Sequence, residues 1–333
     1  MYEAAHKRKI IGTRIHKTMK ERSEERKRNM NESLLYPDKT NSEFLLPSID
    51  NFVETEQVKK LMNRIMRWID TGYPPHLVGP TGCGKTTLAL AVAMRLGLPT
   101  LWLNGDDQMT TVDLVGGYSE VETLSVRDRY IHNVLVAKDR SKYTWVDNPL
   151  TIACKHGYTL IYNEFSRAKP IANNVLLSVL EEGILELPIM FGMERYVKVH
   201  PDFNVIFTSN SIEYAGVYTP QDALLDRMVH IYMDYYDIET EVGIVLRHTG
   251  LPDSKAKEIV RAVREIRERV PPESKPGTRA MIMIGQGLRA FTNPGPEDIK
   301  QVYLDVLSSK IGEHDSASKY ASVIEEILNE AYG

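Results

Sequence analysis

The pattern of apolar and polar positions along the chain predicts short buried strands that alternate with helices. Residues 52–69 place apolar side chains three and four positions apart, which is the spacing of a helix with one packed face. Short apolar runs then recur, each followed by polar residues, as expected of buried strands in a parallel sheet. These runs fall at residues 76–78, 100–103, 159–162, 204–210 and 231–233, with helical patterns between them at 87–96, 149–156, 173–180 and 223–228. This order of strand and helix predicts an α/β fold with a parallel sheet.

The pattern after residue 235 is helical only. Amphipathic stretches at 235–248, 253–269, 278–291 and 297–311 predict a smaller all-helical unit, and 317–331 predicts a terminal helix. We therefore expect four parts in the chain. They are an N-terminal arm and linker (1–45), an α/β core (46–235), a helical domain (236–312) and a C-terminal tail helix (313–333).

Two stretches within the core depart from the rhythm of strand and helix. Residues 184–188 and 196–199 alternate in polarity on either side of Gly192, which predicts a β-hairpin inserted after a helix. Residues 113–118 predict a polar loop, and 130–136 predict a helix after it.

One stretch of the chain matches the phosphate-binding motif G-x-x-x-x-G-K-[ST] at every fixed position. Its glycines allow a tight turn whose N–H groups can point at phosphate oxygens, and the helix that follows adds its positive end. Lys85 is expected to reach the β- and γ-phosphates of ATP, and the hydroxyl of Thr86 to bind Mg²⁺. The motif comprises Gly79, Pro80, Thr81, Gly82, Cys83, Gly84, Lys85 and Thr86.

Polar residues that end two of the other predicted strands supply further candidates. The run 159–162 ends in Asn163 and Glu164, at the strand end where open parallel sheets bind ligands. In a nucleotide-binding protein this position normally carries Asp followed by Glu; here Asn163 can accept a hydrogen bond from a water on Mg²⁺ but adds no charge. Glu164 is the candidate general base, and Asn210 a candidate for ordering the attacking water. How strongly Asn163 supports metal binding and turnover stays open.

Composition narrows the class of partner. The chain has 333 residues, 26% of them charged, and a net charge of -4, which speaks against nucleic acid or acidic lipid as a partner of the whole protein. Two cysteines give no disulfide framework, and with no apolar run near 18 residues and no signal segment we expect a cytoplasmic protein. Residues 1–30 form a basic arm with ten Lys and Arg against four Glu, which is either a solvated, partly helical tail or a contact for an acidic partner surface or nucleic acid.

The order of these features resembles the AAA+ ATPases, and within them the MoxR-like branch. The resemblance covers residues 52–291 and rests on the stretches GPTGCGKTTLA, DLVGGY, LIYNEFSRAKPIANNVLLSVLEEGILELP, VHPDFNVIFTSN, ALLDRM and PGTRA. It implies a P-loop NTPase core with a parallel sheet and an inserted hairpin, followed by a helical lid. It also implies ATP and Mg²⁺ as ligands and a homo-oligomeric, hexameric ring.

The resemblance also assigns roles to single residues. It implies that Asn163 and Glu164 form the second motif, that Asn210 is the first sensor and that Arg279 is the second sensor on the lid. It implies that Arg227 reaches the nucleotide of a neighbouring subunit, with Arg167 a weaker candidate. The hairpin 184–199 and the loop 113–118 would line the pore of the ring. Arginine suits these roles because its fork stays charged and grips phosphate oxygens through two bonds.

The middle stretches are most similar to members of this branch that serve gas vesicle formation. This implies gas vesicle structural or accessory proteins as partners, and an Mg²⁺-dependent ATPase that remodels or helps assemble a protein complex. A P-loop small-molecule kinase is the alternative, although it needs neither the hairpin nor Asn210 and Arg227. A nucleotide-gated scaffold with little hydrolysis is kept open by Asn163, and a regulatory GTPase is disfavoured because no N-K-x-D stretch is present.

Overall fold

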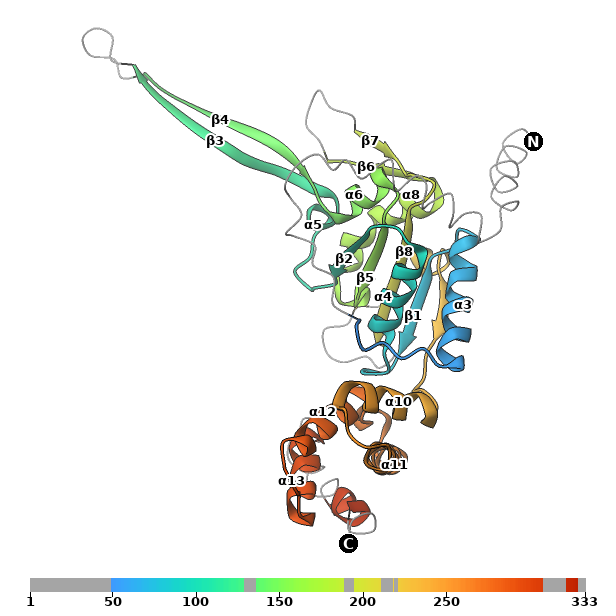
Figure 1. Ribbon diagram of the computed structural model, residues 1–333. Helices are drawn as coiled ribbons and strands as arrows, with labels where there is room; N and C mark the ends of the chain where they lie inside the picture. Colours follow the sequence, from blue (N-terminus) through green and yellow to red (C-terminus); the bar gives the residue numbers. More distant parts are fainter. Residues whose placement is uncertain are drawn as a thin grey trace. The chain divides into compact units, whose positions relative to one another are not determined.

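The computed structural model describes residues 49–128, 136–188, 195–210, 218, 221–307 and 322–328 (Figure 1). The predicted basic arm and linker, residues 1–45, lie outside the described residues, as do residues 130–135 of the predicted helix 130–136. Within the predicted terminal helix 317–331, residues 322–328 are described and are helical.

A five-stranded sheet forms the centre of the α/β part and has the strand order β2-β5-β8-β1-β9. β2 pairs with β5, and β1 pairs with both β8 and β9, all in parallel. The predicted α/β fold with a parallel sheet is confirmed, because each predicted apolar run forms a strand. The strands are β1 (Pro75–Gly79), β2 (Thr100–Asn104), β5 (Thr159–Asn163), β8 (Asn204–Asn210) and β9 (Val229–Tyr232).

Three helices of this part begin and end where their capping residues predict. α3 (Glu56–Asp70) starts after Thr55, whose side chain accepts a hydrogen bond from the Val58 N–H. α4 (Lys85–Leu96) ends at Gly97 in the left-handed conformation. α6 (Pro149–His156) has proline in its first position and ends at Gly157, also left-handed.

Shorter elements fill the segment between β5 and β9. The predicted hairpin is confirmed as β6 (Ile184–Glu186) paired antiparallel with β7 (Tyr196–Lys198). The predicted helix 173–180 is two helices, α7 (Pro170–Asn173) and α8 (Val175–Glu181), and β5 is followed directly by the 3-10 turn η1 (Phe165–Arg167). α9 (Asp222–Leu225) lies where a short helix was expected.

An antiparallel ribbon between β2 and α6 differs from the prediction of a loop at 113–118. α5 (Thr111–Val115) starts with a capping box between Thr110 and Asp113, and β3 (Gly116–Asp128) then pairs with β4 (Val136–Asp147). The loop prediction was therefore wrong, and Val136, assigned to a helix, begins a strand. The two strands form a sheet of their own, separate from the five-stranded sheet.

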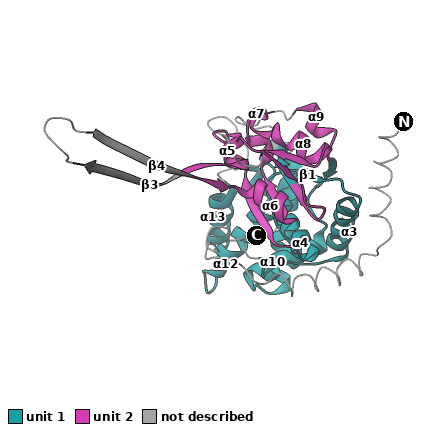
Figure 2. Ribbon diagram, turned by 90° about the horizontal axis from the view of Figure 1, so that it is seen from above, with its two compact units in different colours: residues 1–97, 207–215, 229–333 teal, residues 98–206, 216–228 magenta. Residues whose placement is uncertain are grey.

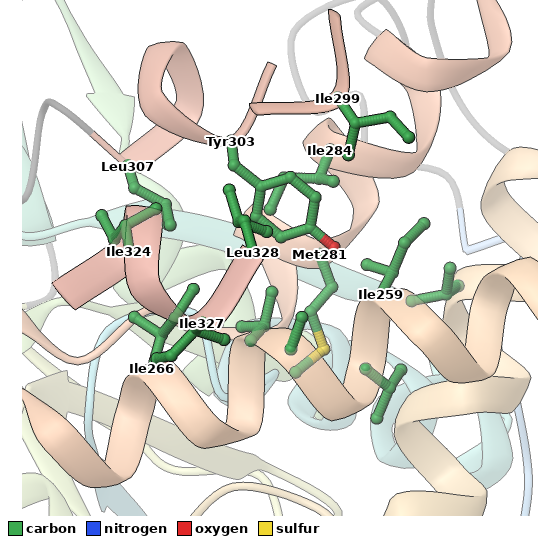
Figure 3. Packing of buried hydrophobic residues seen from close by; sticks show 14 of the residues in the cluster. Ile259, Ile266, Met281, Ile284, Ile299, Tyr303, Leu307, Ile324, Ile327 and Leu328 are labelled. Atoms are coloured by element: carbon green, nitrogen blue, oxygen red, sulfur yellow. The ribbon is translucent and has the colours of Figure 1, made fainter. Parts of the chain in front are cut away.

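The C-terminal part is helical, as predicted, and has its own apolar core (Figure 3). Met281 and Ile284 of one helix belong to the same buried cluster as Ile259 and Ile266 of another, and the side chain of Tyr303 lies within it. Burying each such side chain contributes about 1.5–3 kcal/mol. The helices are α10 (Ile238–Thr249), α11 (Asp253–Arg269), α12 (Thr278–Arg289) and α13 (Pro296–Leu307), with the 3-10 turn η2 (Pro272–Ser274) before α12.

The chain divides into two compact units (Figure 2). Unit 1 comprises residues 1–97, 207–215 and 229–333, and unit 2 comprises residues 98–206 and 216–228. The phosphate-binding motif and the helical part thus belong to unit 1, and β5 with its following residues to unit 2. The predicted division at residues 45, 235 and 312 stays a prediction. Over the described ranges, no helix is long and apolar enough to cross a membrane.

Candidate functional site

The predicted phosphate-binding motif forms a turn between β1 and α4 in unit 1. Gly82 and Gly84 have φ of 79° and 92°, values in the left-handed region that glycine adopts without strain. Gly84 is also the N-cap of α4, so the first N–H groups of this helix lie at the turn. The Cys83 side chain is fully buried, and burial raises the pKa of its thiol. Cys83 therefore stays protonated and serves as a small packed side chain.

The glycines of the turn are required by the protein's own packing. A Cβ on Gly79 would lie 2.3 Å from the carbonyl oxygen of Met233, and one on Gly84 would lie 3.1 Å from the Tyr236 ring. Met233 and Tyr236 follow β9, and the Met233 N–H donates to Val78 O. The sequence motif has glycines here because a side chain would keep phosphate away from the backbone. The structure gives a second reason, since the chain after β9 occupies the space that a side chain would need.

Lys85 is the first residue of α4, and its side chain, which reaches back to the turn, is buried at 5% exposure. Its Nζ donates to Gly79 O at 3.0 Å, to Pro80 O at 2.8 Å and to Asn210 Oδ1 at 3.0 Å. Asn210 is the last residue of β8 and stands beside Gly79 in the parallel register. Two candidates that lie far apart in the sequence are therefore brought together. A buried ammonium needs hydrogen-bond acceptors, and phosphate oxygens can serve as acceptors in the same way as these three oxygens.

The start of α12 packs on the same turn. The Thr278 N–H donates to Gly82 O at 3.1 Å, and a Cβ on Gly277 would lie 2.7 Å from Thr81 O. The exposed Arg279 follows, with its Cβ 3.8 Å from where a Cβ on Gly82 would lie. The structure thus places Arg279 beside the phosphate-binding turn, and its role as a second sensor stays a prediction.

The residues of this turn fit a nucleoside triphosphate. Lys85 and the N-terminus of α4 supply positive charge and N–H donors, and the buried Thr278 Oγ1 has no hydrogen-bond partner among the described residues. Thr86, the second residue of α4, supplies a hydroxyl. Across the described part of the chain, no group of three or more His, Cys, Asp and Glu could hold a metal ion. Mg²⁺, which keeps several waters and binds with phosphate, needs no such group.

The predicted second motif lies in unit 2, at the end of β5. Asn163 Nδ2 donates to Asn104 Oδ1 at 2.9 Å, across the register that pairs the last residues of β5 and β2. Glu164 follows with φ of 52°, the only non-glycine residue with positive φ in the described part of the chain. Its side chain is half-buried.

Asn104 and Gly105 hold this motif, and sequence reasoning did not include them in the site. The Gly105 N–H donates to Asn163 O at 2.7 Å, and a Cβ on Gly105 would lie 2.1 Å from Glu164 O. Their position in the sequence was the available signal. Asn104 ends β2 and Gly105 follows it, and parallel strands of one sheet end at the same edge, where the second motif also lies.

Arg227, predicted to reach a neighbouring subunit, pairs within its own chain. In unit 2 its guanidinium donates to Glu181 Oε2, with Nε at 3.0 Å, and to the carbonyl oxygen of Ala223. The side chains of Arg227 and Glu181 are 28% and 54% exposed. Ion pairs that solvent reaches stabilise a fold by about 0–1 kcal/mol. A stronger acceptor can therefore replace Glu181 as the partner of the Arg227 guanidinium. Arg167 ends η1 and is exposed.

This fold and this turn define a P-loop NTPase core of the AAA+ class. A family model described as AAA domain (dynein-related subfamily) matches residues 76–228, which include the turn and the end of β5.

Relatives over the whole chain are more specific. Gas vesicle ATPase GvpN of Haloferax mediterranei is 46% identical over 341 residues, with 98% of each chain covered. Gas vesicle ATPase GvpN2 of Halobacterium salinarum is 51% identical over 283 residues, covering 85% of this chain and 82% of its own. The chain belongs to this GvpN family of AAA+ ATPases. Among solved structures, a Thermotoga maritima RuvB Holliday junction branch migration motor matches 81% of this chain and 74% of its own at 17% identity, with a TM-score of 0.45.

Proposed function

We propose that this protein binds ATP with Mg²⁺, hydrolyses it, and thereby remodels or helps assemble a protein complex, that of the gas vesicle. The observation that carries the proposal is the buried Lys85 bound to Asn210 at the end of β8, on a turn built like a phosphate site. The relatives named as gas vesicle ATPases support the process, and gas vesicle structural or accessory proteins are the partners we propose.

Each candidate has a place in this proposal. Lys85 and the N–H groups of the turn hold the phosphates, and Thr86 binds Mg²⁺, which neutralises phosphate charge when it is bound. Asn163 contributes through a water on the metal, and Asn210 orients the attacking water. Glu164 removes the proton from that water. The left-handed backbone of Glu164 supports its role, because strained residues that a surrounding structure fixes are concentrated at active sites.

The proposal includes a homo-oligomeric ring, hexameric by resemblance, in which Arg227 completes the site of the neighbouring subunit. An arginine supplied by a neighbour stabilises the charge of phosphoryl transfer, so hydrolysis then depends on assembly. The partly exposed pair of Arg227 with Glu181 supports this, because ion pairs that solvent reaches stabilise a fold only weakly. Residues 113–118 and the hairpin of β6 and β7 are proposed to contact the client protein. The division into an α/β core at 46–235 and a lid at 236–312 belongs to the same proposal.

Mixing two inactive variants tests the shared site. Lys85→Ala removes the phosphate contact of a chain, and Arg227→Ala removes what the chain gives to its neighbour. We expect each variant alone to release little phosphate and the mixture to regain activity, because some sites then combine an intact Lys85 with an intact Arg227. The control is Arg95→Ala, which removes another partly exposed ion pair, with Glu54. Mass measurement with and without ATP and Mg²⁺ gives the assembly state. Specific activity that stays constant from dilute monomer to concentrated oligomer, or a mixture that stays inactive, contradicts the shared site.

A nucleotide-gated scaffold with little hydrolysis is the second candidate, and Asn163 is the observation that favours it. Its amide is bound to Asn104 and brings no negative charge to the metal. We expect Asn163→Asp to bind Mg²⁺ more tightly or to hydrolyse ATP faster. An unchanged rate and metal affinity would mean that the amide already suffices. ATP-dependent assembly of the wild type without phosphate release would favour the scaffold.

A further inference from the structure

A buried ionic network lies in the helical part of unit 1, next to the phosphate-binding turn. Glu241 of α10 is fully buried. Its carboxylate accepts hydrogen bonds from Arg264 Nη1 at 2.7 Å and from Arg267 Nη2 at 3.0 Å, both on α11. Burying a carboxylate is costly unless it is paired and hydrogen-bonded, so these two arginines are required by Glu241.

Arg267 uses the rest of its guanidinium on two other segments. Its Nε donates to Pro276 O at 3.0 Å, and its Cζ lies 3.7 Å from the centre of the Tyr235 ring. The side chain is 8% exposed. Arg267 therefore joins the connection before α10, which contains Tyr235, to the segment before α12, which contains Pro276.

Both segments that the network holds touch the phosphate-binding turn. Pro276 immediately precedes Gly277 and Thr278, and the Thr278 N–H donates to Gly82 O at 3.1 Å. Arg264 Nη1 also donates to Tyr236 O at 3.1 Å, and the Tyr236 ring is the group that a Cβ on Gly84 would meet at 3.1 Å. The network thus fixes the chain on both sides of the turn.

The geometry uses properties that are specific to arginine. A guanidinium is planar and offers several N–H donors in fixed directions, so Arg267 can reach a carbonyl, a carboxylate and the face of a ring at once. A lysine in this place lacks the planar guanidinium that lies flat on the ring while its edge reaches the carbonyl and the carboxylate. Arg269, two residues further along α11, is different: it pairs at the surface with Glu265, at 2.5 Å.

We propose that Arg267 and Glu241 are positioning residues for the nucleotide site. They hold the segment 276–278 against Gly82 and thereby set where Arg279 stands beside the bound phosphates. This inference rests on the proposed function, in which the turn binds ATP. It adds that the affinity for ATP depends on a buried ion pair that touches no part of the nucleotide.

A double-mutant cycle tests the proposal in the full-length protein. Affinity for ATP and ADP with Mg²⁺ is measured by titration, together with KM and kcat, for Arg267→Lys, Glu241→Gln, Arg279→Ala and Arg267→Lys/Arg279→Ala. We expect Arg267→Lys and Glu241→Gln to weaken ATP binding about tenfold, because a hydrogen bond to a charged group is lost or misplaced. The matched control Arg269→Lys keeps wild-type affinity.

The double variant separates positioning from simple destabilisation. If Arg267 acts through Arg279, we expect Arg267→Lys to change the affinity by less than about twofold once Arg279 is alanine. Additive losses, or unchanged affinity in both Arg267→Lys and Glu241→Gln, would overturn the proposal. Thermal unfolding of each variant identifies any that do not fold, and Glu241→Gln, which keeps the shape of the side chain, then serves as the test in the same cycle. A wild type that binds no ATP would overturn the proposed function and this inference together, a result distinct from the other two.

Discussion

The two candidate motifs, the phosphate-binding turn in unit 1 and the second motif in unit 2, are held in different ways. In unit 1 the phosphate-binding turn uses glycine at its left-handed positions and is fixed by contacts from distant parts of the sequence, such as Asn210, 125 residues from Lys85. In unit 2 the second motif places a glutamate, Glu164, in the left-handed region and is fixed by the end of the neighbouring strand. Glycine adopts such a backbone freely, whereas other residues do so at a cost of about 1–3 kcal/mol.

This difference indicates how each motif responds to substitution. The backbone of the turn is unstrained, so substitutions should matter most at the residues that contact it. These are Lys85, which belongs to the motif, and Tyr236 and Thr278, which pack on the turn from other segments. The second motif is strained, so its sensitive point is the support that keeps it in place, Asn104 and Gly105. On the proposed function the turn governs binding of ATP and the second motif governs turnover.

The largest effect is expected for Glu164→Gln. The amide cannot take a proton from water, and general base catalysis contributes about 10²–10⁴-fold, so phosphate release should fall by about a hundredfold or more. ATP affinity should stay the same. Phosphate release and nucleotide titration measure the two quantities, with the exposed Glu182→Gln as control. A rate equal to that of the wild type would remove Glu164 as the base.

Lys85→Ala should act on binding instead. It removes the cation that faces the phosphates together with three hydrogen bonds of Lys85, so ATP affinity should fall by about a hundredfold. Titration with ATP and Mg²⁺ measures the loss, and Lys59→Ala, which removes an exposed lysine paired with Glu56, is the control. Unaltered affinity would disprove the assignment of the turn.

Gly105→Ala tests the support of the second motif. Its Cβ would lie 2.1 Å from Glu164 O, so the backbone must shift, at a cost of about 1–3 kcal/mol in the free energy of unfolding. We expect turnover to be lost and ATP affinity to be retained. Gly295→Ala is the control, because the nearest atom to its Cβ, Asp298 Oδ2, is 3.5 Å away. Full turnover in Gly105→Ala would show that Glu164 needs no such support.

The smallest effect concerns the strand that leads into the turn. His76 of β1 is buried between Ser209, 2.7 Å from its Nε2, and His230, 2.9 Å from its Nδ1. Burial, with a smaller effect of His230, lowers the pKa of His76 from its ordinary value of 6.5 to about 3. Between these two pKa values His76 is protonated in the unfolded chain and neutral in the folded chain. The stability contribution is complete above the unfolded pKa and decreases as pH falls from about 6.5 towards 3.

Urea unfolding at pH 7 and pH 5 measures this dependence. The wild type should lose about 2 kcal/mol of unfolding free energy through His76 between these values, and His76→Gln should lose less by that amount. The exposed His156→Gln is the control and should behave like the wild type. Equal pH dependence in His76→Gln would exclude His76 as the source.

The sequence by itself determined the elements whose pattern is local or set by a core. Buried strands and amphipathic helices carry their period in their side chains, so β1, β5, β8 and α11 lie within a residue or two of their predicted bounds. The phosphate-binding turn was also predictable, because its glycines, lysine and threonine are consecutive. Proximity of Asn210 to this turn followed from the rule that parallel strands end at one edge.

Only the tertiary structure decided the features that depend on contacts between segments distant in the sequence. β3 and β4 form a sheet of their own by pairing with each other, whereas the stretch 113–118 by itself predicted a loop. Asn104 and Gly105 matter because β2 lies beside β5, and Glu241 and Arg267 because α10 and α11 meet where Pro276 passes. The charge of Glu241 and Arg267 and the small size of Gly105 do not indicate which distant segments they contact. A buried arginine and an exposed arginine look the same in the sequence.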